Sequence, residues 1–142
     1  MIILDTNIIS EFMVSQPADS VLQWMNKQQV NSLYLTSITI AEISYGLGTM
    51  PTGKRQQFLI NGFESFIKNG FSDRILSFDF SSGKLYGEIM SHRKTIGRPM
   101  SVFDGQIAAI AKFTGFSIAT RNVKDFEECN IDIINPFEFN IS

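Results

Sequence analysis

The sequence predicts an α/β fold, in which helices cover both faces of a central parallel sheet of about five strands. Short apolar segments alternate along the chain with longer segments of helical periodicity, and the connections between them are short. Parallel strands need such helical crossovers, whereas antiparallel strands can be joined by tight turns. The length of 142 residues suits a single domain, and no repeat or linker divides the chain, so one domain over 1–142 is expected.

Five short apolar segments are expected to form the strands. They lie at 2–4, 33–36, 74–78, 116–120 and 131–134. Apolar runs of this length are typical of strands buried on both faces of a parallel sheet.

Helices are expected between these strands. The first follows residue 5 and breaks near Pro17, and the others cover 18–28, a segment capped by Ser37 or Thr39, 53–68, 81–95 and 101–113. In the third helix, Ile40, Ile43, Ser44 and Leu47 are expected on one side, with Gly46 and Gly48 marking its end. The last helix is rich in alanine and isoleucine, a composition that allows close packing on a sheet.

Charge and composition exclude several classes of protein. With 12 basic and 14 acidic residues, the net charge is −2, so a general polyanion binder with a basic face is excluded. Action on nucleic acid would need local cations or a bound metal. The chain is 44% hydrophobic and only 18% charged, which argues against disorder and suggests apolar surface covered by a partner. Phe58, Phe63 and Phe66 fit the core best, with a dimer or partner groove as the alternative.

The single cysteine, the N-terminal sequence and the length of the apolar runs bear on the cellular compartment. Cys129 cannot form an internal disulfide, no Cys/His set suits zinc, and no cationic neighbour in sequence would activate this thiol. The opening MIILDTN lacks the features of a signal peptide, and no apolar run approaches the ~20 residues that span a bilayer. A cytoplasmic protein without a membrane segment is expected.

Three carboxylates stand in otherwise apolar surroundings. Asp5 follows the first strand, and Glu42 and Asp104 lie in apolar helical segments. Each has a local alternative role: Asp5 as a helix N-cap, Glu42 as a solvent-facing residue and Asp104 as an acid in the first turn of a helix. Ligand sites in parallel sheets form at the carboxyl ends of the strands. Carboxylates gathered there repel one another unless a cation binds, and oxygen ligands select Mg²⁺ or Mn²⁺.

Four segments around these acids resemble the PIN-domain nucleases, specifically the VapC/FitB type of toxin from type II toxin–antitoxin systems. The segments are MIILDTNIISE, TSITIAEISYGL, GRPMSVFDGQIAAIA and FSIATRNVKDFEECNIDIINPF, and together they extend over essentially the whole chain. The resemblance implies a PIN-like domain and a metal-dependent endoribonuclease that hydrolyses RNA phosphodiester bonds, commonly in tRNA or rRNA. It also implies a homodimer neutralised by an antitoxin, which contacts DNA on the toxin's behalf.

The resemblance assigns Asp5, Glu42 and Asp104 as the catalytic and metal-binding residues, with Mg²⁺ or Mn²⁺ as the cofactor. Asn7 and Thr120 would support them by hydrogen bonds.

The chain departs from the family at its fourth acidic position. Many relatives have an Asp two residues after the threonine of the fourth strand, whereas this chain has Asn122, followed by Asp125. The local alternative is Asn122 as an N-cap with Asp125 in the first helical turn. One well-held metal is expected, with a second entering only with RNA.

Five basic residues near these segments are candidates for contacts with RNA phosphates, unless they are simply solvated surface: Arg93, Lys94, Arg98, Arg121 and Lys124. His92, the single histidine, lies late in its helix, where favourable interaction with the helix dipole is a better explanation than general-base catalysis.

Two other functions compete with the nuclease. Asn122 permits a catalytically weak PIN-fold module that acts with an antitoxin on operator DNA. A phosphatase with Asp5 as the nucleophile would usually carry a second Asp two residues later, where this chain has Asn7.

Overall fold

A computed structural model of the chain describes residues 1–140, so the predicted domain of 1–142 includes two residues outside the described part. It contains a five-stranded sheet in the order β3-β2-β1-β4-β5, in which every neighbouring pair is parallel. The strands are β1 (Ile2–Leu4), β2 (Leu33–Thr36), β3 (Ile75–Leu76), β4 (Ser117–Ala119) and β5 (Ile133–Ile134). The predicted fold class is confirmed, and the N-terminal strand lies at the centre of the sheet.

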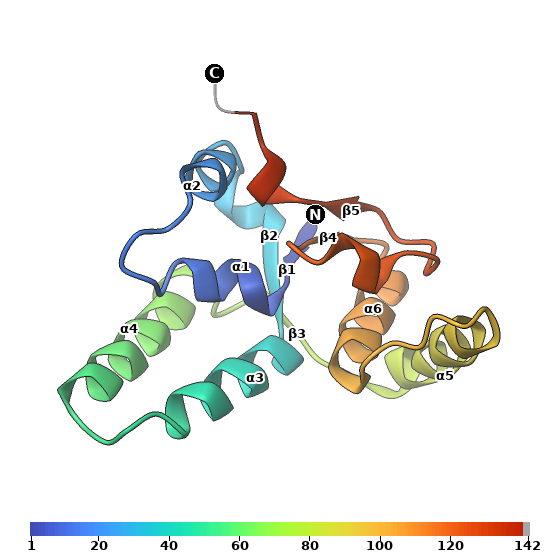
Figure 1. Ribbon diagram of the computed structural model, residues 1–142, viewed down its shortest axis with the longest axis horizontal. Coiled ribbons are helices and arrows are strands. Elements are labelled where there is room, and N and C mark those ends of the chain that lie inside the picture. The colour runs from blue at the N-terminus through green and yellow to red at the C-terminus, as the bar shows by residue number, and fades with distance from the viewer. Residues whose placement is uncertain (141–142) are drawn as a thin grey trace.

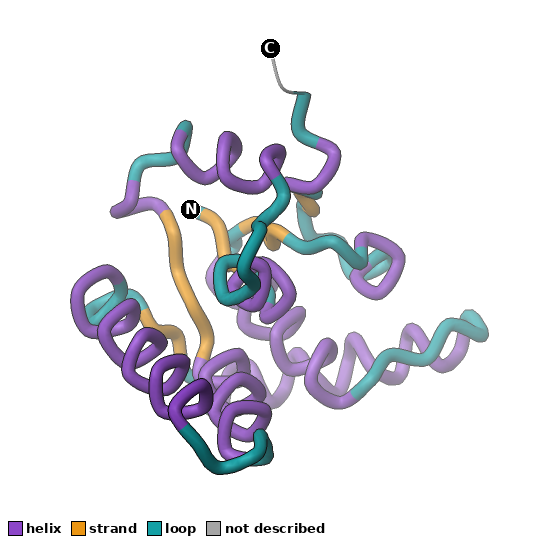
Figure 2. Tube along the Cα trace, turned by 60° about the vertical axis from the view of Figure 1, so that its left-hand side comes forward, coloured by secondary structure: helices purple, strands orange, loops and turns teal. Residues whose placement is uncertain are grey.

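Helices cover both faces of this sheet. They are α1 (Thr6–Glu11), α2 (Asp19–Asn26), α3 (Ser37–Gly48), α4 (Lys54–Gly70), α5 (Phe80–Thr95) and α6 (Val102–Thr114). Three short 3-10 segments complete the described structure: η1 (Val30–Ser32), η2 (Val123–Phe126) and η3 (Pro136–Glu138). Figure 1 shows α1 to α4 on one side of the strands and α5 and α6 on the other, and Figure 2 shows the strands enclosed between the helices.

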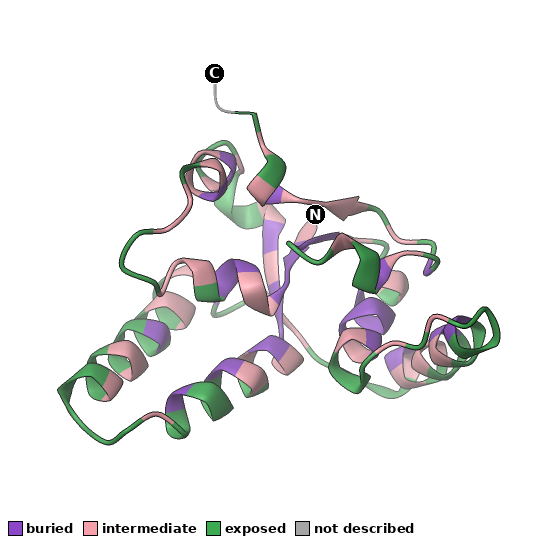
Figure 3. Cartoon of the chain, viewed as in Figure 1, coloured by how far each residue is buried: buried purple, intermediate pink, exposed green. Residues whose placement is uncertain are grey.

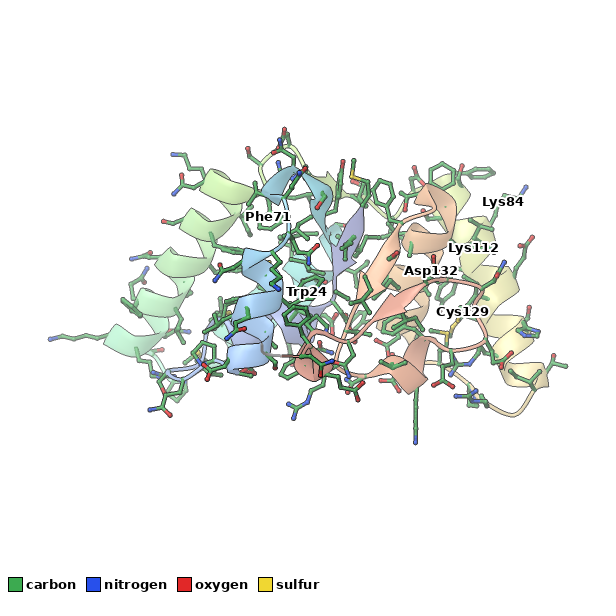
Figure 4. The ribbon with its side chains drawn as sticks, turned by 90° about the horizontal axis from the view of Figure 1, so that it is seen from above. Trp24, Phe71, Lys84, Lys112, Cys129 and Asp132 are labelled. Carbon is green, nitrogen blue, oxygen red and sulfur yellow. The ribbon has the colours of Figure 1, made fainter. Side chains whose placement is uncertain are left out.

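Two hydrophobic clusters hold the layers together. Leu4 belongs to the cluster under α1 to α4, with Trp24 and Phe71, whereas Ile3 belongs to the cluster under α5 and α6, with Cys129. Figure 4 places Trp24 and Phe71 on the opposite side of the strands from Cys129. Figure 3 shows the buried residues concentrated in the strands and on the inward sides of the helices. Because successive residues of β1 enter different clusters, this strand is fixed from both faces.

Several boundaries differ from the sequence prediction. Strands predicted at 74–78 and 131–134 contribute only Ile75–Leu76 and Ile133–Ile134 to the sheet. In the chain before the second, Glu128 and Asn130 adopt left-handed backbone conformations, with φ of 63° and 58°.

The first turn of α3 also differs from expectation. The predicted cap at Ser37 or Thr39 is wrong, because Thr36 is the N-cap and its side chain accepts from the Thr39 N–H. Ser44, predicted on the apolar side of this helix, is exposed.

Gly105 allows α5 and α6 to pack closely. A Cβ at this position would lie 2.9 Å from Cε2 of Tyr86 and closer still to Sδ of Met90. A side chain here would require the Tyr86 and Met90 side chains of α5 to move. Within residues 1–140, no helix combines the length and the apolarity that crossing a membrane requires.

Candidate active site

Asp5 lies at the carboxyl end of β1 and is the N-cap of α1. The side chain is buried; Oδ1 accepts from the Thr6 N–H at 2.8 Å, and Oδ2 accepts from the Thr120 hydroxyl at 2.8 Å and from Asn7 Nδ2 at 3.2 Å. Burial raises the pKa of Asp5 from 3.8 to about 6, against the lowering effect of the Thr120 and Thr6 hydrogen bonds. A nearby positive charge would therefore stabilise the ionised form of this buried carboxylate.

Asn7 and Thr120 connect the ends of the two central strands. Asn7 Nδ2 donates to the Thr120 hydroxyl at 3.1 Å, and Asn7 Oδ1 accepts from the Arg121 N–H at 3.1 Å. The Thr120 hydroxyl also accepts from the Asn122 N–H at 3.1 Å. The contacts of Asn7 with Thr120 and Arg121, like that of Thr120 with Asp5, join residues more than a hundred positions apart, and they fix the orientation of Asp5.

Glu42 is half-buried on α3 and approaches Asp5 through Thr6. Its Oε1 accepts from the Thr6 hydroxyl at 2.8 Å, and that hydroxyl lies 3.1 Å from the hydroxyl of Thr39. Neither threonine was among the predicted site residues. Thr39 and Glu42 are three positions apart on one helix, so their shared face was a signal available in the sequence.

Asp104 lies in the first turn of α6, whose N-cap is Ser101. Its pKa is raised by burial; the negative charge of Asp125 also raises this pKa, whereas the Ser101 hydrogen bond and the positive charge of Arg93 lower it. The negative charges of Asp104 and Glu42 in turn raise the pKa of Asp5, so these acids are close enough to interact electrostatically.

A pocket of about 450 Å³ brings the predicted acids together at the carboxyl edge of the sheet. Five carboxylates line it, from Asp5, Glu11, Glu42, Asp104 and Asp125. Glu11 was not predicted; its Oε2 accepts from the Ala18 N–H at 2.9 Å, and nothing in the spacing of its neighbours singled it out. Figure 1 shows the N-terminal ends of α1, α3 and α6 close to one another, near the carboxyl end of β1.

The described residues contain no group of three or more acidic, His or Cys side chains that could hold one metal ion. Simultaneous ligation by all three predicted carboxylates is therefore not present in this arrangement. The donor set nevertheless suits Mg²⁺, because this ion commonly uses one or two carboxylates and keeps several of its waters.

Asn122 and Asp125 both line the pocket. Asn122 is the N-cap residue of η2 and Asp125 lies in its first turn, as in the local alternative, although the Asn122 side chain makes no capping hydrogen bond. Its carbonyl instead accepts from the Asp125 N–H at 3.0 Å. The neutral amide and the additional carboxylate are thus both available at the pocket.

The basic residues separate into surface and interior positions. Arg121 and Lys124 are exposed and line one depression beside the pocket, and the Arg121 guanidinium carbon lies 4.7 Å from the centre of the Phe137 ring. Arg98 pairs with Glu127 at 3.2 Å. The predicted contact of Arg93 with RNA phosphates is wrong. Arg93 is only 4% exposed and its guanidinium donates to backbone carbonyls, so it is not available to RNA.

The Arg93 side chain also corrects the description of Cys129, because Nη1 lies 3.7 Å from Sγ and supplies a cationic neighbour. Burial nonetheless raises the pKa of Cys129 overall, so the thiol is still expected to be unreactive. His92 is exposed in the last turn of α5 and does not line the acidic pocket.

The three phenylalanines of α4 have different environments. Phe63 is buried, Phe66 is half-buried and Phe58 is 76% exposed. All three line an apolar groove of about 410 Å³ between α4 and the segment around Phe12 and Met13. The helix therefore contributes both to the core and to an open apolar surface.

Comparison with known proteins places these features in a family. The family model described as PIN domain matches residues 2–130. The VapC ribonuclease Y4jK of Sinorhizobium fredii is 42% identical over 138 residues, covering 97% of this chain and 99% of that protein. The toxin FitB of Neisseria gonorrhoeae is 36% identical over 137 residues, covering 96% and 99%. The crystal structure of FitAcB from Neisseria gonorrhoeae superposes with a TM-score of 0.93 at 36% identity, over 98% and 100% of the two chains. This chain therefore belongs to the PIN domain family, among relatives of the VapC and FitB type.

Proposed function

We propose that this chain is a metal-dependent endoribonuclease, the toxin of a type II toxin–antitoxin pair, which hydrolyses phosphodiester bonds of tRNA or rRNA. The observation that carries the proposal is the pocket of carboxylates around the buried Asp5, at the edge of the sheet where parallel folds bind ligands. Relatives named VapC ribonuclease and tRNA(fMet)-specific endonuclease VapC support the activity.

The proposed cofactor is Mg²⁺ or Mn²⁺, held by Asp5 and Asp104, with Glu42 as a further ligand or as the group that orients water. Burial raises the pKa of both aspartates, and a bound cation would oppose this shift because it favours their ionised forms. When bound, such an ion polarises the scissile phosphate and lowers the pKa of a bound water.

The chain's own residues supply orientation and substrate contacts. Thr6, Thr120 and Asn7 fix both oxygens of Asp5, and Thr6 also holds Glu42 by its Oε1. Arg121 lines the edge of the pocket, and Lys124 and Arg98 lie beside it. All three are proposed to contact RNA phosphates, which would offset the net charge of −2 near the site.

The proposed protein partners are a cognate antitoxin and a second copy of the chain. Relatives were solved as toxin–antitoxin complexes, among them FitAB bound to an IR36 DNA fragment, with a TM-score of 0.93 and 35% identity. The apolar groove beside Phe58 supports a protein partner, because it leaves large apolar side chains open to solvent. DNA would be contacted through the antitoxin.

The purified, antitoxin-free chain should be incubated with total cellular RNA, with Mg²⁺ or with EDTA, beside Asp5→Asn and Asp104→Asn variants. Discrete cleavage that requires both the metal and the two carboxylates is the expected result, and the cut ends would identify the target. Intact RNA with a folded, metal-binding wild type would instead favour a PIN-fold module that acts with an antitoxin on operator DNA. A metal titration unchanged in Asp104→Asn would refute the proposed ligand set.

A further inference from the structure

Arg93 is a buried arginine that forms no ion pair with a carboxylate in residues 1–140. Its side chain is 4% exposed, and the ion pairs of this part of the chain join Arg74 to Asp73 and Arg98 to Glu127. Isolated buried charges are costly, so such a residue needs a compensating set of hydrogen bonds. Arg93 finds these on backbone carbonyls and not on acidic side chains.

The carbonyls belong to two separate segments. Nε donates to the Arg98 carbonyl at 2.6 Å, in the turn between α5 and α6. Nη1 donates to the carbonyls of Asp125 at 3.0 Å and Glu127 at 2.7 Å, in the loop that follows β4. One guanidinium thus joins the segment leading to Asp104 with the segment that carries Asp125.

The loop at 124–130 depends on such contacts for its shape. Glu128 and Asn130 both adopt the left-handed backbone region. Asparagine tolerates this region, but for a glutamate it is unfavourable and is kept only where surrounding interactions impose it. The Arg98 side chain adds a contact to Glu127 Oε2 at 3.2 Å from the surface. The buried contacts of Arg93 therefore hold the loop from the inside.

We propose that Arg93 is a positioning residue of the acidic pocket. It holds the loop at 124–130 so that the Asp125 carboxylate faces a divalent cation beside Asp104. The inference rests on the proposed function, because it assigns Asp125 a part in cation binding. A planar guanidinium suits this role, since its N–H groups point in several fixed directions, whereas a lysine ammonium is a single point of charge.

The test uses the full chain without antitoxin and Mn²⁺ alone as the probe. Arg93→Lys keeps the charge but removes the planar set of guanidinium N–H donors. Asp125→Asn removes the carboxylate that these donors are proposed to position. Val21→Ala is the matched control, because it opens a cavity in the other hydrophobic cluster and leaves the loop untouched. Mn²⁺ affinity is measured by calorimetry, and amide exchange by mass spectrometry on peptides covering 121–131.

We expect Arg93→Lys to weaken Mn²⁺ binding about ten-fold, as is typical when a residue that orients a metal ligand is lost. Asp125→Asn should cost a similar factor, and the double variant should cost little more than either, because both changes remove one interaction. Val21→Ala should retain wild-type affinity. Amide exchange at 121–131 should accelerate in Arg93→Lys and stay at the wild-type rate in Val21→Ala.

Additive losses in the double variant, or unchanged Mn²⁺ affinity in Arg93→Lys, would overturn the inference. A wild-type chain that binds no Mn²⁺ would refute the proposed metal site itself. The exchange measurement separates the two failures, since unchanged exchange at 121–131 in Arg93→Lys would by itself exclude a positioning role.

Discussion

The buried carboxylate of Asp5 should destabilise the metal-free protein at neutral pH. Its pKa is 3.8 when unperturbed and about 6 in the folded chain. Below pH 3.8 both the folded and the unfolded states are protonated at this position. As the pH rises from there to about 6, the unfolded chain loses the proton while the folded chain keeps it, so the free energy of unfolding falls.

The size of this effect follows from the pKa difference. A change from 3.8 to about 6, at about 1.4 kcal/mol per pH unit, corresponds to about 3 kcal/mol lost by neutral pH. Asp5→Asn removes the titration. Its amide cannot accept from all three of the present donors, Thr6 N–H, Thr120 hydroxyl and Asn7 Nδ2, which costs about 1 kcal/mol at every pH. The pH dependence of the difference between the two proteins is therefore the quantity to measure.

Urea denaturation in EDTA from pH 4 to 7.5 provides the assay. As the pH rises, the free energy of unfolding of Asp5→Asn minus that of the wild type should increase by up to about 3 kcal/mol. Mg²⁺ should then stabilise the wild type and leave the variant unchanged. Asp132→Asn removes one negative charge from an exposed position and controls for net charge. Parallel pH profiles for wild type and Asp5→Asn would refute the reasoning.

Three further predictions test other features. Gly105→Ala should lower the free energy of unfolding by about 1–3 kcal/mol in chemical denaturation, because its Cβ would overlap Met90, whereas Gly87→Ala, which meets nothing within 4 Å, should raise it by up to about 1 kcal/mol. Asn122→Asp adds a carboxylate to the acidic pocket and should tighten Mn²⁺ binding about ten-fold in calorimetry; equal or weaker binding would place this position outside the ion's reach. Arg121→Ala should weaken RNA binding and reduce the slope of log affinity against log salt by about 1, and an unchanged slope would exclude a phosphate contact.

The parts of the molecule that follow from local pattern were predictable. The apolar segments before Asp5 and Thr120 predict two buried strands. The structure adds that these strands are neighbours, and this adjacency brings the two residues into contact. Glu42 and Asp104 stood out because each is an acid in an apolar helical segment, and both line the same pocket as Asp5. The family resemblance added the expected chemistry, which no periodicity contains.

The features that escaped prediction depend on how loops fold. Arg93 has the sequence environment of a solvated residue at the end of a helix, and it is buried only because the loop at 124–130 closes around its guanidinium. Glu11 and Thr6 reach the pocket through the angle at which α1 leaves β1. The sequence places the N-cap of α3 one or three residues after its true position at Thr36. Threonine and serine are both good N-caps, so neighbouring Thr and Ser residues cannot be told apart by residue type.

The hydrogen bond between Asp5 and Thr120 spans 115 positions of the chain, and it has a consequence for synthesis. β1 emerges from the ribosome before β4, so the central strand remains without this neighbour until residues 117–119 have been made. Contacts of such high sequence separation form late, after a long loop has been closed. A nascent or prematurely terminated chain therefore contains Asp5, Glu42 and even Asp104 without the arrangement that brings them together. For a protein proposed to cleave tRNA or rRNA, this order of assembly delays formation of the site until β4 has been made.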